Sequence, residues 1–227
     1  MSGALPRWTR PRVEGLYGIL DRAVAAAGAS DPPGALARAL GEALAGGCRV
    51  VQYRDKEASP AALLARARGL AGACRAAGAI FIVNDRLDVA LLSEADGCHL
   101  GQDDLPLEEA RRIAPPHFIL GASTHDVVEA RRAQALGADY IGVGAIFPTT
   151  SKADAAEPRG LRLVSEVAAA VAIPAIAISG VTRGNAREVL RAGASGFAVI
   201  SDLFGGPGIR ERAAEFARIW DEEKRRR

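Results

Sequence analysis

The chain has 227 residues, of which 49% are hydrophobic, 5% aromatic and 25% charged, and its formal net charge is +2. So small a charge argues against nucleic acid or an anionic membrane surface as a partner, because those polyanions attract strongly basic proteins. Small phosphorylated molecules need only a local cluster of cations and remain compatible with this composition. The scarcity of aromatic residues predicts an interior of Ala, Val, Leu and Ile, which is typical of α/β proteins.

The three cysteines, Cys48, Cys74 and Cys98, are an odd number without Cys-x-x-Cys spacing. This pattern argues against a disulfide framework and against a zinc site. We therefore expect reduced and mostly buried thiols.

The first fourteen residues carry two prolines and several arginines but no continuous apolar stretch. They do not resemble a secretory signal, so a cytoplasmic location is expected. The longest apolar run, residues 167–178, is interrupted by Pro174 and is too short to cross a bilayer. We expect residues 1–14 to form a flexible extension and residues 15–227 to form one catalytic domain. The sequence leaves open whether the chain forms a homo-oligomer.

From residue 15 onward, short apolar segments alternate with helical stretches rich in Ala, Leu and Arg. Eight strands are predicted, at residues 15–20, 50–53, 80–83, 97–100, 119–123, 140–143, 175–178 and 196–200. Eight helices are predicted to follow them, at residues 33–45, 60–77, 87–93, 107–113, 127–136, 161–170, 185–192 and 209–224.

The residues between these segments support the same boundaries. Ser59 and Pro60 are suited to the cap and the first position of a helix, while Gly78, Gly137 and Gly193 each stand where a helix must end. Eight consecutive strand-helix units without an intervening hairpin predict a single (β/α)8 TIM barrel.

Polar residues follow the predicted strands, and in such a barrel the carboxyl ends of all strands face one mouth. Asp85 and Asp104 would meet there and repel each other unless a cation lies between them. Magnesium fits, because it accepts one or two carboxylates together with water and phosphate oxygens. The alternative is that each aspartate caps the helix that follows it.

Gln52, Arg54 and Lys56 alternate along an extended segment, so their side chains are expected on one side, facing the mouth. Asn84, Ser123 and Lys152 would join them. A diphosphate needs several such cations, because each close charge pair contributes on the order of 4 kcal/mol at an effective dielectric near 20. Without the other polar clusters, Arg54 and Lys56 would be interpreted as residues of a solvated loop after a strand.

The last two strands are followed by Ser179-Gly180 and by Ile200-Ser201. Barrels commonly bind a phosphate at this position through backbone N–H groups, although a tight turn alone also explains Gly180. A diphosphate site and a separate phosphate site predict two phosphorylated substrates.

The three histidines receive different interpretations. His99 lies within a strand and is read as an interior side chain held by hydrogen bonds, with catalysis as the alternative. His125 follows a strand end and is a candidate for the mouth, whereas His117 is read as solvated. No set of His and Cys has zinc spacing, and no Ser-His-Asp or Cys-His arrangement is evident.

Almost the whole chain, from Gly15 to about Phe204, resembles the thiamine phosphate synthase family. The resemblance rests on an ordered set of short motifs: 52–56 (QYRDK), 83–86 (VNDR), 96–104 (DGCHLGQDD), 121–125 (GASTH), 144–152 (GAIFPTTSK) and 178–181 (ISGV). One departure is Ser179, where many relatives carry glycine.

The resemblance implies that a pyrimidine diphosphate joins a thiazole phosphate, giving thiamine monophosphate and pyrophosphate. It implies Mg²⁺ on Asp85 and Asp104. The positions matching the pyrimidine diphosphate site are Gln52, Arg54, Lys56, Asn84, Ser123 and Lys152, of which Arg54, Lys56, Ser123 and Lys152 are the predicted catalytic residues. The positions matching the thiazole phosphate site are Thr149, Thr150, Ser151, Gly180, Ile200 and Ser201.

Two rival interpretations assign the chain to other classes of function, an isomerase and a non-catalytic binding protein. A thiazole tautomerase on the same barrel would move a proton through a residue such as His125 and would need neither magnesium nor a diphosphate. A non-catalytic phosphate-binding barrel would act as a sensor. The presence of Asp85 and Asp104 together with Lys56 and Lys152 favours the synthase over both.

Overall fold

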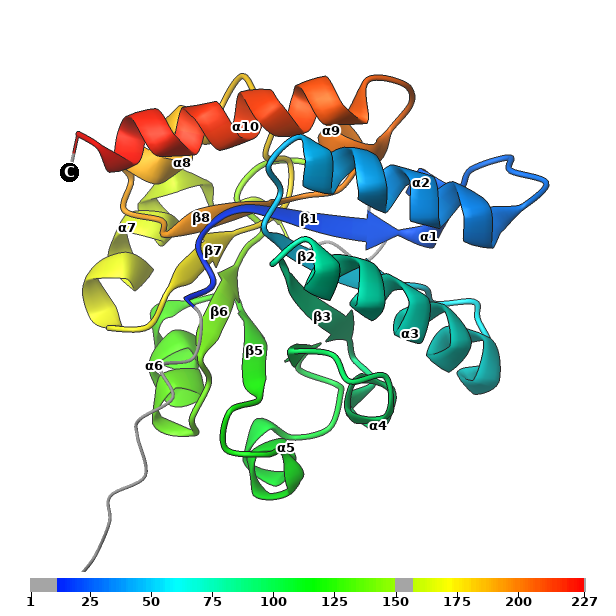
Figure 1. The fold of residues 1–227 in the computed structure, drawn as a ribbon. Coiled ribbons are helices and arrows are strands. Elements are labelled where there is room, and N and C mark those ends of the chain that lie inside the picture. Colours follow the sequence, from blue (N-terminus) through cyan, green and yellow to red (C-terminus); the bar gives the residue numbers. More distant parts are fainter. Residues whose placement is uncertain (1–11, 150–156, 227) are drawn as a thin grey trace, which may run out of the picture.

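The computed structural model describes residues 12–149 and 157–226. Eight parallel strands pair in sequence order, and the eighth pairs with the first, so the sheet is a closed barrel (Figure 1). The strands are β1 (Gly15–Asp21), β2 (Val50–Arg54), β3 (Ile80–Asn84), β4 (Gly97–Leu100), β5 (Ile119–Thr124), β6 (Tyr140–Val143), β7 (Ala175–Ala177) and β8 (Gly196–Val199). The TIM barrel predicted from the sequence is confirmed.

Helices surround the strands (Figure 1). They are α1 (Arg22–Ala25), α2 (Pro32–Ala45), α3 (Pro60–Ala76), α4 (Leu87–Leu92), α5 (Leu107–Ile113), α6 (Val127–Ala135), α7 (Gly160–Ala170), α8 (Ala186–Arg191), α9 (Ser201–Phe204) and α10 (Ile209–Lys224). The eight predicted helices agree with α2 to α8 and α10, most to within a residue at each end. Two one-turn helices, α1 and α9, were not predicted, because four residues are too few to show a helical period.

The predicted turn chemistry is present. The Ser59 side chain accepts a hydrogen bond from the Ala62 N–H at the start of α3, and Pro60 occupies the first helical position. Gly78, Gly137 and Gly193 have φ of +65°, +90° and +108°, which a glycine adopts without steric cost. Each helix therefore stops where the chain must turn back into the next strand.

The apolar residues form two layers. Inside the barrel, an inner cluster includes Tyr17, Ile82 and Tyr140. A larger outer cluster fills the space between strands and helices and contains all three cysteines, which are buried and unpaired. The barrel interior is thus packed with apolar side chains, and polar side chains occupy the end of the barrel at which the strands have their carboxyl termini.

Some sequence predictions concern residues that the structure does not describe. Thr150, Ser151 and Lys152 lie outside the described residues, as does most of the predicted extension at residues 1–14. Within the described ranges, every helix is too short or too polar to cross a membrane.

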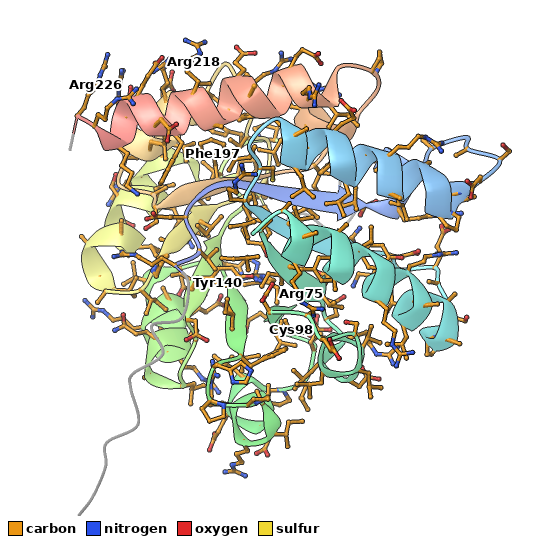
Figure 2. The ribbon with its side chains drawn as sticks, in the orientation of Figure 1. Arg75, Cys98, Tyr140, Phe197, Arg218 and Arg226 are labelled. Carbon is orange, nitrogen blue, oxygen red and sulfur yellow. The ribbon has the colours of Figure 1, made fainter. Side chains whose placement is uncertain are left out.

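The final helix, α10, covers β1 and β8 (Figure 1), and Figure 2 shows Phe197 of β8 beneath it. Phe216 of α10 is fully buried, with its ring centroid 5.4 Å from that of Phe197. We expect Phe216→Ala to lower the free energy of unfolding by about 3–5 kcal/mol, because it removes a buried ring and leaves a cavity.

A denaturant titration followed by circular dichroism measures this change. Val128→Ala is the control, because Val128 is 76% exposed and its loss should change stability by less than about 0.5 kcal/mol. A loss below about 1 kcal/mol for Phe216→Ala would contradict the role of α10 in closing the core.

Candidate active site

The carboxyl ends of the strands surround a cavity of about 300 Å³. The side chains predicted for the mouth of the barrel line it together: Gln52, Arg54, Lys56, Asn84, Asp85, Asp104 and Ser123. Gln52, Arg54 and Lys56 face the same side, as their alternation predicted. Closure of the barrel therefore gathers residues from β2 to β5 and their loops at one place.

A second cavity of about 340 Å³ lies beside the first. Thr149, Gly180, Ile200 and Ser201, four of the six residues predicted to hold a thiazole phosphate, line it. The two cavities share three lining residues, Ile178, Ser179 and Ala198. The mouth is thus one continuous space with two compartments.

Asp85 and Asp104 meet in the first cavity, and neither caps a helix. The first turn of α4 has no side-chain cap, and Asp104 accepts a hydrogen bond from the Gly101 N–H at 2.7 Å instead. The first turn of α5 is also without a side-chain cap, so the capping alternative is wrong for both residues. Burial raises the pKa of the Asp104 carboxyl above its ordinary value, and the neighbouring Asp85 carboxyl raises it further.

The backbone of Asp85 is left-handed, with φ of +63°. Its N–H donates to the carbonyl of His99 at 2.8 Å, which ties the end of β3 to β4. Non-glycine residues seldom adopt this conformation, and strained backbone often occurs at functional sites. The strain directs the Asp85 carboxylate into the mouth rather than along the following helix.

The two cations after β2 are held differently. Arg54 is paired with Asp21 on β1, and the side chains are only 17% and 5% exposed. Lys56 contacts the Asp85 carboxylate at 2.6 Å, but its side chain is 59% exposed. Exposed pairs contribute roughly 0–1 kcal/mol, so Lys56 can change partners at low cost whereas Arg54 is fixed.

Asp21 was not predicted as a site residue. Its carboxylate accepts from the Ala23 N–H as well as from Arg54, and the strand register pairs Asp21 directly with Arg54. Its position at the end of β1 was the one signal that the sequence offered.

Two tyrosines at the cavity floor were also missed. Tyr17 on β1 and Tyr140 on β6 line the cavity, and their hydroxyl oxygens are 2.8 Å apart. His99 contacts Tyr140 through Nδ1 at 2.9 Å and Ser123 through Nε2 at 3.0 Å. The prediction of a hydrogen-bonded interior His99 is confirmed. A Ser–His contact is present, but a phenol rather than a carboxylate orients the ring, so this is no Ser-His-Asp triad.

His125 lies at the cavity edge, as predicted, and its Nδ1 is 3.0 Å from the Glu129 carboxylate one helical turn away. Gln102 lines the cavity as well and donates to the carbonyl of Ser123 at 2.6 Å. Both contacts hold the β4 and β5 loops in place.

The glycine at position 180 is required by its own surroundings. Gly180 has φ of +65°, and a Cβ there would lie 2.4 Å from the carbonyl oxygen of Pro148. The close approach therefore explains this glycine without a ligand. Ser179, the departure from the family pattern, has φ of +77°, a conformation that glycine adopts at lower cost.

Within residues 12–149 and 157–226, no three His, Cys, Asp or Glu side chains gather as a metal centre would. The mouth supplies two carboxylates instead. This donor set suits Mg²⁺, which binds through one or two carboxylates and takes its remaining oxygens from water and substrate phosphate. Burial is the main cause of the raised pKa of Asp104, and the neighbouring Asp85 carboxyl adds to it; a cation between the two carboxylates would relieve their repulsion.

Residues 22–203 match the family model described as thiamine monophosphate synthase. The chain belongs to the thiamine monophosphate synthase family. It is 55% identical over 159 residues to the thiamine-phosphate synthase of Methanocella arvoryzae, covering 70% of this chain and 75% of that one. It is 49% identical over 176 residues to the same enzyme of Methanospirillum hungatei, covering 78% and 85%.

The family's fold is also found in a solved structure. The thiamine phosphate pyrophosphorylase from Pyrococcus furiosus superimposes with a TM-score of 0.82 at 38% identity, covering 92% of this chain and 96% of that one.

The strained backbone at Asp85 gives a prediction. Asp85→Gly and Asp85→Ala both remove the carboxylate, so the difference between them isolates the backbone. We expect the glycine variant to be more stable by about 1 kcal/mol, because a left-handed alanine is strained. Urea unfolding of the two variants measures the difference. At most positions the alanine variant is the more stable of the two. If it were so here, the backbone at position 85 would not be left-handed in solution.

Proposed function

We propose that the chain joins 4-amino-5-hydroxymethyl-2-methylpyrimidine diphosphate to a thiazole phosphate, forming thiamine monophosphate and releasing pyrophosphate. The observation that carries this proposal is the pair of adjoining cavities. One is lined by two cations and two carboxylates, and the other by the loops that follow β7 and β8. Two phosphorylated substrates thus have separate places that open into each other.

The diphosphate is assigned to the first cavity. Arg54 is preorganised by its buried pairing with Asp21, so it binds a phosphate oxygen without losing side-chain freedom. Lys56 leaves Asp85 at small cost and turns to the diphosphate. Lys152, which lies outside the described residues, is proposed as the third cation from its place in the family motif.

Asp85 and Asp104 are the proposed ligands of Mg²⁺. When bound, the ion neutralises charge that develops on the departing pyrophosphate. Asp104 is oriented for this role by the Gly101 N–H, and Asp85 by its left-handed backbone. The Asp85 carboxylate, once released by Lys56, would be free to hold the cation.

The thiazole phosphate is assigned to the second cavity, near Thr149, Gly180 and Ser201. Loops after the last two strands of such barrels commonly bind phosphate. Thr150 and Ser151, which lie outside the described residues, are proposed to complete this site.

Leaving-group stabilisation dominates the proposed mechanism. The thiazole nitrogen already has a lone pair, so no general base is needed to create the nucleophile. As the bond to the diphosphate breaks, Arg54, Lys56 and Lys152 stabilise the leaving charge, and the electron-rich aminopyrimidine supports the cation on its methylene carbon. The thiazole, held by its phosphate, captures this cation before water does.

His125 is not assigned a chemical step. Its Nδ1 contacts Glu129, so the histidine is already engaged in the loop structure. The relatives reported above carry synthase names, and no observation favours the tautomerase.

We propose a cytoplasmic location and small-molecule partners alone. The unpaired cysteines support a reducing compartment. Burial raises the pKa of Cys48 to about 11 and that of Cys74 to about 12, so these thiols stay protonated and unreactive.

Incubation of the protein with both phosphorylated heterocycles, with and without Mg²⁺, tests the proposal. Thiamine phosphate is quantified by fluorescence after oxidation to thiochrome, and pyrophosphate by a coupled assay. We expect equal amounts of both products, formed only with Mg²⁺. Absence of thiamine phosphate under these conditions would refute the proposed function.

Asp85→Asn should reduce Mg²⁺-dependent turnover by about 100-fold or more, because a lost ligand removes several kcal/mol of charge stabilisation. Asparagine tolerates the left-handed backbone, so the fold should persist. Asp103→Asn, an equal charge change at the same cavity, is the control and should change turnover by less than about threefold. Full activity of Asp85→Asn with unchanged Mg²⁺ dependence would contradict the ligand assignment.

A further inference from the structure

The loop that follows β7 carries three consecutive backbone N–H groups that have no hydrogen-bond acceptor within the described part of the chain. They belong to Ser179, Gly180 and Val181, and all three residues line the second cavity. Val181 is only 5% exposed. Backbone donors at buried positions are nearly always paired, because an unpaired one is costly. A ligand with several acceptor oxygens would pair these three.

The carbonyl groups of the same loop show where the first two N–H groups point. The carbonyls of Ile178 and Ser179 accept hydrogen bonds from two consecutive N–H groups of the loop after β6, each at 3.1 Å. In a trans peptide the C=O and the following N–H point in opposite directions. Because β7 lies between β6 and β8, the N–H groups of Ser179 and Gly180 point toward the β8 side, where the second cavity lies.

The third peptide, between Gly180 and Val181, is held by a side chain instead. Asn185 donates through Nδ2 to the Gly180 carbonyl at 3.0 Å, and its Oδ1 accepts from the Thr182 N–H at 2.8 Å. These two partners fix the orientation of the amide, because a carbonyl only accepts and an N–H only donates. Asn185 lies behind the loop and does not line the cavity. The Val181 N–H therefore points away from Asn185 and toward the cavity.

Helix capping does not account for this asparagine. Asn185 occupies the N-cap position of α8, yet its side chain makes no cap hydrogen bond with that helix. Asparagine is a preferred N-cap residue because its side-chain oxygen can accept from an N–H of the first turn. Here the amide is directed back to the preceding loop, so α8 is left without a side-chain cap in favour of the loop contact.

The glycine at position 180 makes the loop contact necessary. Glycine is required there because a Cβ would meet the Pro148 carbonyl oxygen. Glycine also adopts more backbone conformations than any other residue, so the peptide that follows it can rotate at little cost. Rotation would bring the Gly180 carbonyl to the cavity in place of the Val181 N–H, and the carbonyl would repel an anion. The Asn185 amide holds this peptide in the orientation that presents a donor.

We propose that Asn185 is a positioning residue for the phosphate group that binds in the second cavity. It does not touch the phosphate. Its amide fixes the peptide between Gly180 and Val181, so that the Val181 N–H joins those of Ser179 and Gly180 as a donor to the phosphate oxygens. Successive backbone N–H groups of this kind form a concave site for an anion.

The identity of this phosphate as that of the thiazole substrate rests on the proposed function. The orientation of the peptide between Gly180 and Val181 does not, because it is a property of the free protein. The two parts of the inference are therefore tested with different ligands, the thiazole phosphate and inorganic phosphate.

Asn185→Ser separates the loop contact from helix capping. Serine is too short to reach the Gly180 carbonyl, but it is a preferred cap for α8, so the variant should fold. Calorimetry should show that it binds the thiazole phosphate about 10-fold or more weakly than wild type, because a hydrogen bond to a charged group is lost. Its affinity for the pyrimidine diphosphate, assigned to the first cavity, should change by less than about twofold. Wild-type affinity for the thiazole phosphate in this variant, or in Asn185→Ala if the serine variant does not fold, would overturn the proposal.

Gln134→Ala is the matched control. The Gln134 Oε1 accepts from the N–H groups of Ala172 and Ile173, so a side-chain amide holds the loop before β7 as Asn185 holds the loop after it. Gln134 lines neither cavity. Its variant should keep the wild-type affinity for the thiazole phosphate. A loss equal to that of Asn185→Ser would show that any loosening around β7 weakens binding, and would overturn the positioning role.

A nuclear magnetic resonance titration with inorganic phosphate examines the loop without any reaction. In ¹⁵N-labelled wild type, phosphate should move the amide proton signals of Ser179, Gly180 and Val181 downfield, because these groups donate to an anion. In Asn185→Ser the shift of the Val181 signal should be lost. Unmoved signals in wild type, or an undiminished Val181 shift in the variant, would overturn the proposal. If the signals moved as expected but wild type did not bind the thiazole phosphate, the proposed function would fail while the positioning role of Asn185 stood.

Discussion

The mutual repulsion of two carboxylates is the constraint around which the mouth of this barrel is organised. Asp85 and Asp104 come from neighbouring strand ends, and their proximity contributes to the raised pKa of Asp104. The sequence does not relieve this repulsion with a buried arginine. It supplies Lys56, an exposed and easily displaced cation, and it holds Asp85 in a left-handed backbone that keeps its carboxylate in the mouth. A site that maintains such repulsion is suited to a divalent cation that arrives with its substrate.

In the proposed function, the two cavities hold the two phosphorylated substrates of one substitution reaction. The first contains the charged side chains that are proposed to stabilise a leaving diphosphate, and hydrogen bonds join Tyr17, Tyr140 and His99 along its lining. The second is bounded by the loops after β7 and β8, where Gly180 packs against Pro148. Because Ile178, Ser179 and Ala198 border both cavities, the proposed nucleophile and electrophile would be held in adjoining compartments. In the proposed mechanism, this adjacency brings the reacting groups together.

Much of this arrangement was predictable from the sequence, because strand ends in a closed parallel barrel share one mouth regardless of their separation along the chain. The side chains that contact these site residues were not predictable. Asp21 contacts Arg54 only because β1 and β2 pair in a register that sets them side by side. Tyr17 and Tyr140 resemble ordinary apolar strand residues in the sequence, and their place in the cavity depends on which face of each strand points inward, which a strand that is apolar on both faces does not reveal. The left-handed Asp85 likewise has no signal in residue type alone.

A manganese titration tests the central claim most directly. Free Mn²⁺ is counted by electron paramagnetic resonance at a fixed metal concentration, with and without pyrophosphate, and with pyrophosphate alone as the blank. If Asp85 and Asp104 share a cation with the diphosphate, pyrophosphate should tighten Mn²⁺ binding to the protein by about 10-fold or more, and the double variant Asp85→Asn/Asp104→Asn should lose that enhancement. Equal Mn²⁺ affinity with and without pyrophosphate, or an undiminished enhancement in the double variant, would contradict the account.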